Sequence, residues 1–326
     1  MTTEAKARPM VPRRQTLTRL FFSRLFKEKK LGLVGGFIVL VLLVVGILAP
    51  WLAPFGFNEI HLADRMDPPS TSYLLGTDGI GRDVLSRIIF GARISMIVSI
   101  GASAIATAIA AFIGLTSGYI GGKFDLAVQR LVDAWLCFPA LIVLLTAMAL
   151  MGPGILQVTL VLGISTGIGG SRLIRSGVIA IRSNAYVDAA SAIGASTGGV
   201  LVRHLLPNIV PLLIIFFTVG MAGMILGEAS LSFLGFGIPP PEPSWGGMLS
   251  MEGRSYMLQA PWLALCPGLS LTIVVYGVNM FGDAMRDLLD PRLRGGGRFG
   301  ALGLRKAPAK TAGTATAGGE GEGGGV

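Results

Sequence analysis

Few residues of this chain could take part in covalent chemistry or bind a metal, and they are scattered. The two histidines, His61 and His204, lack the spacing of metal ligands. Both cysteines, Cys137 and Cys266, lie within apolar segments. The run from Gly121 to Phe124 resembles a phosphate-binding loop only faintly, because it lacks the first glycine and the Ser or Thr after the lysine. The sequence therefore predicts neither an enzyme nor a nucleotide or metal site.

Three charged residues fall within or near long apolar stretches. Arg130 and Asp133 are three residues apart, so a helix would place them on one face. We interpret them as a structural ion pair near the cytoplasmic interface in preference to a gate. Glu228 lies deep in another stretch, where burying a charge costs roughly 2.5–3.5 kcal/mol, so it is predicted to need a wet cavity or a partner. These three residues are candidate intramembrane polar sites.

Composition indicates a membrane protein. Of the 326 residues, 52% are hydrophobic and 14% are charged, and the mean hydropathy is +0.69. An ordinary soluble domain carries about 25% charged residues, so most of this chain is predicted to lie in lipid. The net charge is +9, but the basic residues flank apolar segments instead of forming one patch. We therefore expect membrane lipid, and not nucleic acid, as a partner.

Six segments are apolar over the roughly 20 residues that a membrane-spanning helix needs. They are Leu31–Leu52, Ile94–Gly118, Ala127–Met151, Ile155–Ile174, Ile209–Leu234 and Trp262–Phe281. The small residues of the second segment predict close packing well inside a bundle. Pro139 predicts a kink in the third segment. The sequence thus predicts an all-α membrane protein with six transmembrane helices.

The distribution of Lys and Arg predicts the orientation. These residues gather in residues 1–30, in the loop after the fourth segment and in the tail after the sixth. The alternate loops, at 53–91 and 235–261, hold more acidic than basic residues. With six helices, all cation-rich segments fall on one side, which is expected to be the cytoplasm. Both termini are therefore predicted to be cytoplasmic.

Three parts follow from these patterns. Residues 1–30 form a basic cytoplasmic arm, in which 15–30 carry an apolar stripe that favours an interfacial helix over a disordered arm. Residues 31–294 form the six-helix domain, with a cytoplasmic loop at about 182–207. Residues 295–326 are mostly Gly, Ala and Thr, with almost no large apolar groups, and are predicted to be disordered.

Residues 188–208, between two of the apolar segments, have the pattern of a small helix-turn-helix. Asp188 to Ile193 predicts a short helix, which Gly194 can end because glycine adopts a left-handed cap without a Cβ clash. A second short helix is predicted to run toward Leu206, and Pro207 suits the first turn of the next long helix. Such a feature favours a docking site for a partner over a chemical site.

The same segment resembles the EAA loop of the membrane subunits of ABC importers. Asp188-Ala189-Ala190 is followed by Gly194 six residues after the aspartate and by Pro207 nineteen residues after it, with aspartate where the family has glutamate. In that family the loop forms a coupling helix that enters a groove on the ATPase subunit. By this resemblance, Asp188 to Gly194 would contact the ATPase, and the rest of the loop would brace the next helix. The implied coupling residues are Asp188, Ala189, Ala190, Gly194, Ala195 and Pro207.

Three further stretches resemble permeases of dipeptide, oligopeptide and nickel importers, of the type that pairs with a second, different permease. They are LGTDGIGRDVLSR at 75–87, EASLSFLGFG with the following PPPEPSWG at 228–246, and DAMRDLLDPR at 283–292. Because several motifs occur in the right order, the resemblance covers the chain from about residue 20 to 293. The basic arm and the glycine-rich tail lie outside it.

The resemblance implies a type I ABC importer transmembrane fold in a bacterial inner membrane, working by alternating access. The implied partners are a second homologous permease in a heterodimer, two ATPase subunits and an extracytoplasmic substrate-binding protein. No cofactor is expected on this chain, since ATP and Mg²⁺ would be bound by the ATPase subunits. Peptides are the leading solute; nickel or another small solute, and an ion-coupled secondary transporter using Glu228, are the alternatives.

Overall fold

A computed structural model describes residues 30–289 of the chain. The predicted interfacial helix at 15–30, apart from Lys30, and the predicted disordered tail at 295–326 lie outside these residues. All regular elements between residues 30 and 289 are helices, and one isolated backbone bridge joins Thr77 and Asp83. The prediction of an all-α protein is confirmed for this part of the chain.

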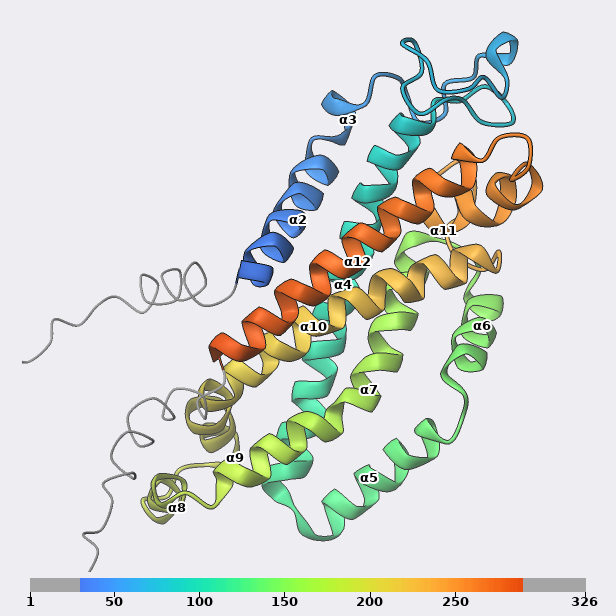
Figure 1. Ribbon diagram of the computed structural model, residues 1–326. Helices are drawn as coiled ribbons and strands as arrows, with labels where there is room; N and C mark the ends of the chain where they lie inside the picture. The colour runs from blue at the N-terminus through green and yellow to red at the C-terminus, as the bar shows by residue number, and fades with distance from the viewer. Residues whose placement is uncertain (1–29, 290–326) are drawn as a thin grey trace, which may run out of the picture. The chain divides into compact units, whose positions relative to one another are not determined.

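The longer helices form a bundle, with the shorter ones at its ends and at the bend between α5 and α7 (Figure 1). The longer ones are α2 (Lys30–Ile47), α4 (Val84–Ile120), α5 (Gly122–Leu136), α7 (Ile155–Arg182), α10 (Leu206–Phe233) and α12 (Trp262–Leu289). The shorter ones are α3 (Ala49–Leu52), α6 (Ala140–Met151), α8 (Ala185–Ala192), α9 (Thr197–Val200) and α11 (Trp245–Met248). A 3₁₀ turn, η1 (Leu62–Asp64), and two π-helical turns, η2 (Leu201–Leu205) and η3 (Leu249–Gly253), complete the set.

Four helices in residues 30–289 are long and apolar enough to cross a membrane, and a bent pair makes a fifth candidate. The four are Lys30–Ile47, Val84–Ile120, Thr197–Phe233 and Trp262–Leu289, and the pair is α5 with α6. The helix α7 has 28 residues, but its second half carries Arg172, Arg175 and Arg182, so it is less apolar. The count of six spans and the cytoplasmic placement of both termini stay predictions.

The kink predicted at Pro139 is confirmed, but it divides the third predicted segment, Ala127–Met151, into two helices, which corrects the prediction of one spanning helix. The helix α5 ends at Leu136, α6 begins at Ala140, and the two are bent by 84°. Pro139 lacks the N–H that would continue the helix, and its ring disfavours helical backbone at Phe138. The fifth segment also differs, since helix is continuous over 197–233 through η2 and absorbs the second short helix expected before Leu206.

The helices α4 and α7 pack closely along small residues. A Cβ added at Gly163 would lie 2.8 Å from Ile105, and one added at Gly167 would lie 2.8 Å from Ile109, so the two helices run parallel. On α4, a Cβ at Gly114 would lie 2.8 Å from the α7 backbone. Because lipid is as apolar as the side chains, such close backbone approach stabilises helix pairs in membranes. The predicted inner position of the second segment is confirmed, because α4 also packs against α2, α10 and α12.

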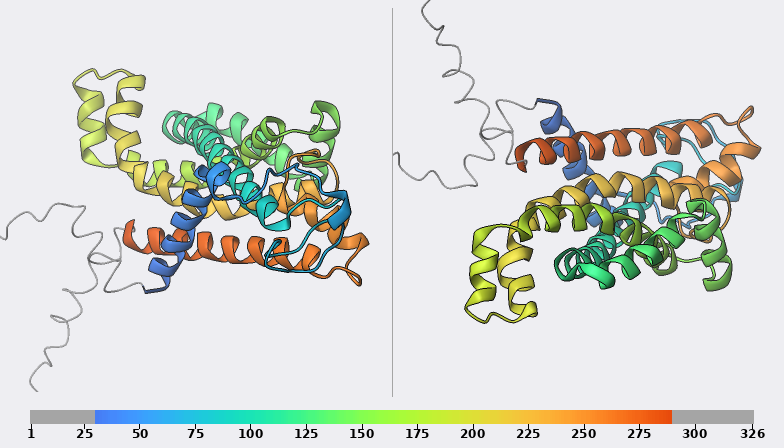
Figure 2. Two further views of the ribbon diagram at one scale, coloured as in Figure 1. Left: turned by 90° about the horizontal axis from the view of Figure 1, so that it is seen from above. Right: turned by 90° about the horizontal axis from the view of Figure 1, so that it is seen from below.

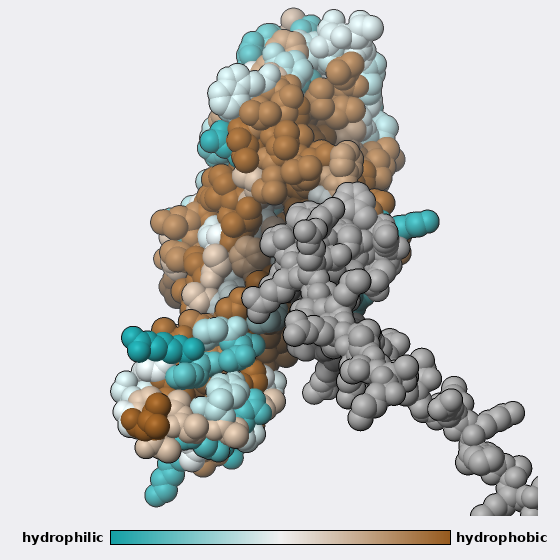
Figure 3. Space-filling view, turned by 90° about the vertical axis from the view of Figure 1, so that its left-hand side faces the viewer, coloured by the Kyte–Doolittle hydropathy of each residue, from teal (hydrophilic) through white to brown (hydrophobic). Residues whose placement is uncertain are grey.

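Surface hydropathy separates a central apolar region from two polar ends. On the face shown in Figure 3, hydrophobic residues gather over the middle and hydrophilic residues over both ends. The short helices α8 and α9 lie at one end of α10 and extend beyond the neighbouring helices in both views of Figure 2, whereas α11 lies toward the other end. The two ends therefore present different polar segments for partners.

Candidate functional site: the coupling segment

Buried apolar contacts hold the loop at residues 182–207, here called the coupling segment, on the bundle. Val187 and Ala190 of α8 are buried, and Val187 belongs to one apolar cluster with Ile174 and Val178 of α7. Val200 of α9 belongs to the same cluster, so α8 and α9 are both held by one apolar cluster. The helix α8 is therefore braced along one face and open on the other.

A glycine cap ends α8. Gly194 has a φ of +86°, and its N–H donates to the carbonyl of Ser191 at 3.1 Å. The N–H of Ala195 donates to the carbonyl of Ala190, also at 3.1 Å. These two bonds form the Schellman motif, which satisfies carbonyls that the helix end would leave free. The predicted glycine cap is confirmed, although α8 begins at Ala185, three residues before the predicted start.

The open face of α8 and its cap carry most of the predicted coupling residues. Asp188, Ala189 and Gly194 are exposed, and Ile193 at the tip keeps 86% of its surface accessible. Ala195 is half-buried, and Ala190 is buried. An apolar tip next to a carboxylate on a projecting helix suits insertion into a groove of a partner.

The sixth predicted coupling residue is placed apart from the others. Pro207 is exposed in the first turn of α10, as predicted, beyond the π-helical turn η2. The helical backbone of η2 runs directly into this turn. The structure thus brings together five of the six residues, and their contact with an ATPase stays a prediction.

The predicted ion pair between Arg130 and Asp133 is present, with 3.8 Å between Nη1 and Oδ2. Asp133 has a second and closer partner, Arg172 of α7. One turn from the start of α5, Asp125 likewise accepts from Arg175, with Nε 2.6 Å from Oδ1. Both arginines lie about 40–50 residues away in the sequence, so the spacing rule that finds the local pair cannot find them.

Glu228 is fully buried, as expected from its place in the sequence, and a hydroxyl is its partner. Its Oε1 accepts from Ser232 Oγ at 2.8 Å, and Oε2 has no partner among the described residues. Ser232 Oγ also accepts from the N–H of Ile238 at 3.2 Å. The carboxyl thus fixes the loop that follows α10, and any role in transport stays a prediction.

A second polar cluster, missed by the sequence reasoning, lies at the other end of the bundle. Arg82 bridges two carboxylates, with Nε 2.6 Å from Asp78 Oδ2 and Nη2 2.9 Å from Glu252 Oε1. All three line a cavity of about 170 Å³. Burial, and then the neighbouring Asp78 carboxylate, raise the pKa of Glu252. The GTDGIGRD motif contains Asp78 and Arg82, but no local signal indicates a partner 170 residues away.

The helical fold and the projecting coupling segment are those of a membrane transport permease. Residues 110–295 match the family described as "Binding-protein-dependent transport system inner membrane component". Residues 16–69 match the "N-terminal TM domain of oligopeptide transport permease C". The chain therefore belongs to the inner-membrane components of binding-protein-dependent transport systems.

Individual relatives agree with this assignment. The dipeptide transport system permease protein DppC of Alkalihalophilus pseudofirmus is 37% identical over 268 residues, which are 82% of this chain and 88% of the relative. The glutathione transport system permease protein GsiD of Escherichia coli is 35% identical over 275 residues, 84% of this chain and 90% of the relative. Family members are ABC transporter permeases of the inner membrane, and not enzymes.

A solved structure shares the fold. In inward-facing conformations of the MetNI methionine ABC transporter, a chain matches with a TM-score of 0.51 at 16% identity. The match covers 63% of this chain and 96% of that one. At this identity the likeness supports the type I importer fold alone.

Proposed function

We propose that this chain is one of two homologous permease subunits of an ATP-driven peptide importer. It would form the translocation pathway with a second permease, receive solute from an extracytoplasmic binding protein, and respond to two ATPase subunits that bind ATP and Mg²⁺. Relatives named for dipeptide and glutathione transport support a short peptide as the solute. We prefer peptides to nickel as the solute because both of these relatives are named for the transport of peptides.

The observation that carries the proposal is the projecting, capped α8. Its buried face is packed against α7, and its other face presents Asp188 and Ile193 to solvent. A helix that is rigid at its base and open at its tip can pass a displacement to the helices that hold it. An ion-coupled secondary transporter has no need of such an element.

The test replaces one glycine of the coupling segment. Gly194→Val forces a β-branched residue into a left-handed backbone, a strain of about 1–3 kcal/mol, although no atom lies within 4 Å of the new Cβ. We expect normal membrane insertion but loss of ATPase co-purification, or of uptake, when the variant is co-expressed with its transporter partners. Pull-down of the ATPase subunits and uptake of labelled dipeptides are the measurements.

Gly198→Val is the matched control. Gly198 lies in the same segment, is exposed, and also has open space around its Cβ, but it needs no left-handed backbone. This variant is expected to behave like the wild type. Normal uptake by Gly194→Val, or the absence of any ATPase subunit bound to the wild-type chain, would contradict the proposed function.

A further inference from the structure

A cluster of polar groups joins three helices next to the coupling segment. Arg175 of α7 binds Asp125 of α5 in a bidentate pair, with Nε 2.6 Å from Oδ1 and Nη2 in contact with Oδ2. Arg182, the last residue of α7, donates from Nη1 to the carbonyl of Gly118 near the end of α4, at 2.9 Å. We call these four residues, Gly118, Asp125, Arg175 and Arg182, the junction.

Electrostatics favour each contact of the junction. The side chains of Asp125 and Arg175 keep only 15% and 29% of their surface exposed, so their charge-assisted bonds are partly shielded from water. Asp125 lies in the first turn of α5, where a negative charge suits the helix dipole. Arg182 contributes to the positive field around Asp125 and places its charge at the C-terminal end of α4, where a cation is favoured.

Apolar packing does little to hold the helix α5 in place. Only Val132 of this helix is buried. At its start, Gly121 and Gly122 have φ values of +68° and +57°, and at its end the chain bends by 84° into α6. Ion pairs to α7, more than apolar packing, therefore fix the position of α5.

The junction shares Arg182 with the coupling segment. Arg182 ends α7, and α8 begins three residues later at Ala185. A displacement of α8 would first reach the last turns of α7, which carry Arg175 and Arg182. The salt bridge between Arg175 and Asp125 connects these turns to α5.

We propose that the junction passes movement of the coupling segment to α5, with Asp125 and Arg175 as positioning residues. This inference rests on the proposed function, because it takes the coupling segment to be the part that the ATPase subunits move. In it, α5 and the cytoplasmic end of α7 move as one unit, while the glycines before α5 and the bend after it absorb the change in direction.

A double-mutant cycle in the assembled complex, reconstituted in liposomes, tests the proposal. Asp125→Asn, Arg175→Gln and the double variant are compared for ATP hydrolysis and for uptake of labelled dipeptides. We expect hydrolysis to continue while uptake per ATP falls about tenfold in each single variant, within the usual range of coupling between sites. The double variant should lose no more than either single one, because both changes remove the same contact.

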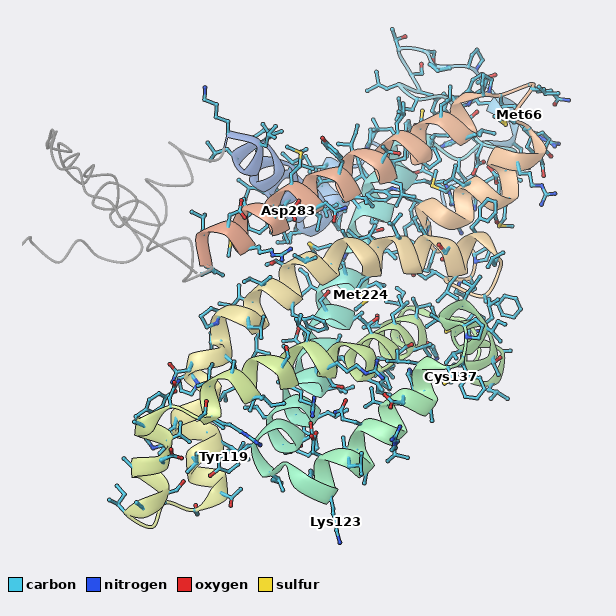
Figure 4. The ribbon with its side chains drawn as sticks, turned by 60° about the horizontal axis from the view of Figure 1, so that its bottom comes forward. Met66, Tyr119, Lys123, Cys137, Met224 and Asp283 are labelled. Atoms are coloured by element: carbon cyan, nitrogen blue, oxygen red, sulfur yellow. The ribbon has the colours of Figure 1, made fainter. Side chains whose placement is uncertain are left out.

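Lys123→Gln is the matched control, because it removes a charge from the same turn of α5. Lys123 points away from the other helices (Figure 4), so uptake per ATP should equal that of the wild type. Normal coupling in both single variants, or losses that multiply in the double variant, would overturn the proposal.

A distance measurement keeps the proposal testable if a variant fails to assemble. Spin labels at Leu131 of α5 and Ile179 of α7, both exposed, are placed in a complex whose Cys137 and Cys266 are replaced. With the junction intact, the distance between the labels is expected to stay constant between the nucleotide-free and ATP-bound complexes. A changed distance would refute movement as one unit, whereas a wild-type chain that recruits no ATPase would refute the proposed function itself.

Discussion

At the scale of single residues, Ser232 shows how one hydroxyl fixes two elements. Its Oγ donates to the buried Glu228 and accepts from the N–H of Ile238, in the loop after α10. Gly246 of α11, which follows this loop, lies directly against the backbone of Ala229, leaving no room for a side chain. The loop between α10 and α11 is therefore held to the helix by a hydrogen-bonded chain and by close backbone contact.

We expect Ser232→Ala to destabilise the chain. The substitution leaves the carboxyl of Glu228 and the N–H of Ile238 without their shared partner, and an unsatisfied buried polar group costs about 1–3 kcal/mol. Thermal unfolding of the purified protein in detergent would show a lower midpoint. Ser230→Ala is the control: the Ser230 side chain is exposed, and its hydroxyl donates to the carbonyl of Leu226 one turn back. Equal effects of the two changes would contradict this role of Ser232.

Residue roles could be predicted from the sequence where the cause is local. Glycine's access to left-handed backbone predicts the cap at Gly194, and proline's missing N–H predicts that Pro207 lies in the first turn of α10. Both predictions depend on only a few neighbouring residues. The partner of Asp133 on α7 and the partner of Arg82 on η3 depend on how distant helices meet. One sequence carries no local signal for such pairs.

At the scale of elements, the parallel pair of α4 and α7 depends on the absence of side chains. Gly167→Val is expected to force the helices apart, because a new Cβ would lie 2.9 Å from the carbonyl oxygen of Ala106 and 2.8 Å from Ile109. Overpacking of this kind costs roughly 1–3 kcal/mol. The thermal midpoint in detergent should fall. Gly223→Val on α10, where a Cβ meets no atom within 4 Å, should leave it unchanged.

The contact between the GTDGIGRD loop and η3 should depend on pH. Because the pKa of Glu252 is raised in the folded protein, the fold binds this proton more tightly than the unfolded chain, and stability is lost as pH rises through the folded pKa. Glu252→Gln is therefore expected to melt above the wild type at neutral pH, with the difference shrinking as the pH is lowered and the wild-type carboxyl gains its proton. Melting curves across this range are the measurement.

Glu242→Gln is the control for this pH dependence. Glu242 lines the same cavity but is exposed, so its replacement should leave the melting temperature unchanged across the range. A difference between Glu252→Gln and wild type that stays constant with pH would show that the ion pair with Arg82, and not the proton on Glu252, sets the effect.

The sequence predicted the positions of the long helices well, but it predicted less well where a helix bends or continues. Apolar runs located the long helices, because burial in lipid requires them. The same signal extended across Pro139, where the backbone turns by 84°, and it placed the start of α10 too late, because residues 197–205 are polar enough to suggest a separate helix. Hydropathy indicates which segments are suited to lipid, but it does not indicate whether a helix is straight.

At the scale of the whole molecule, charge and apolar surface point to one arrangement in the membrane. Along the sequence, positive residues gather near the coupling segment, and acidic residues outnumber basic ones in the loops at 53–91 and 235–261. The face shown in Figure 3 is apolar between two polar ends. From the positive-inside rule we expect the coupling segment in the cytoplasm, where ATPase subunits would reach it. The arrangement is testable because each end carries a highly exposed side chain.

Ile193 and Leu258 are the probes for this test, with 86% and 99% of their surfaces exposed. In a variant that lacks Cys137 and Cys266, a membrane-impermeant maleimide added to right-side-out vesicles should label Leu258→Cys but not Ile193→Cys. After detergent opens the vesicles, both positions should react, which shows that neither cysteine is masked by the fold. Labelling of Ile193→Cys in sealed vesicles would place the coupling segment outside the cell, beyond the reach of any cytoplasmic ATPase.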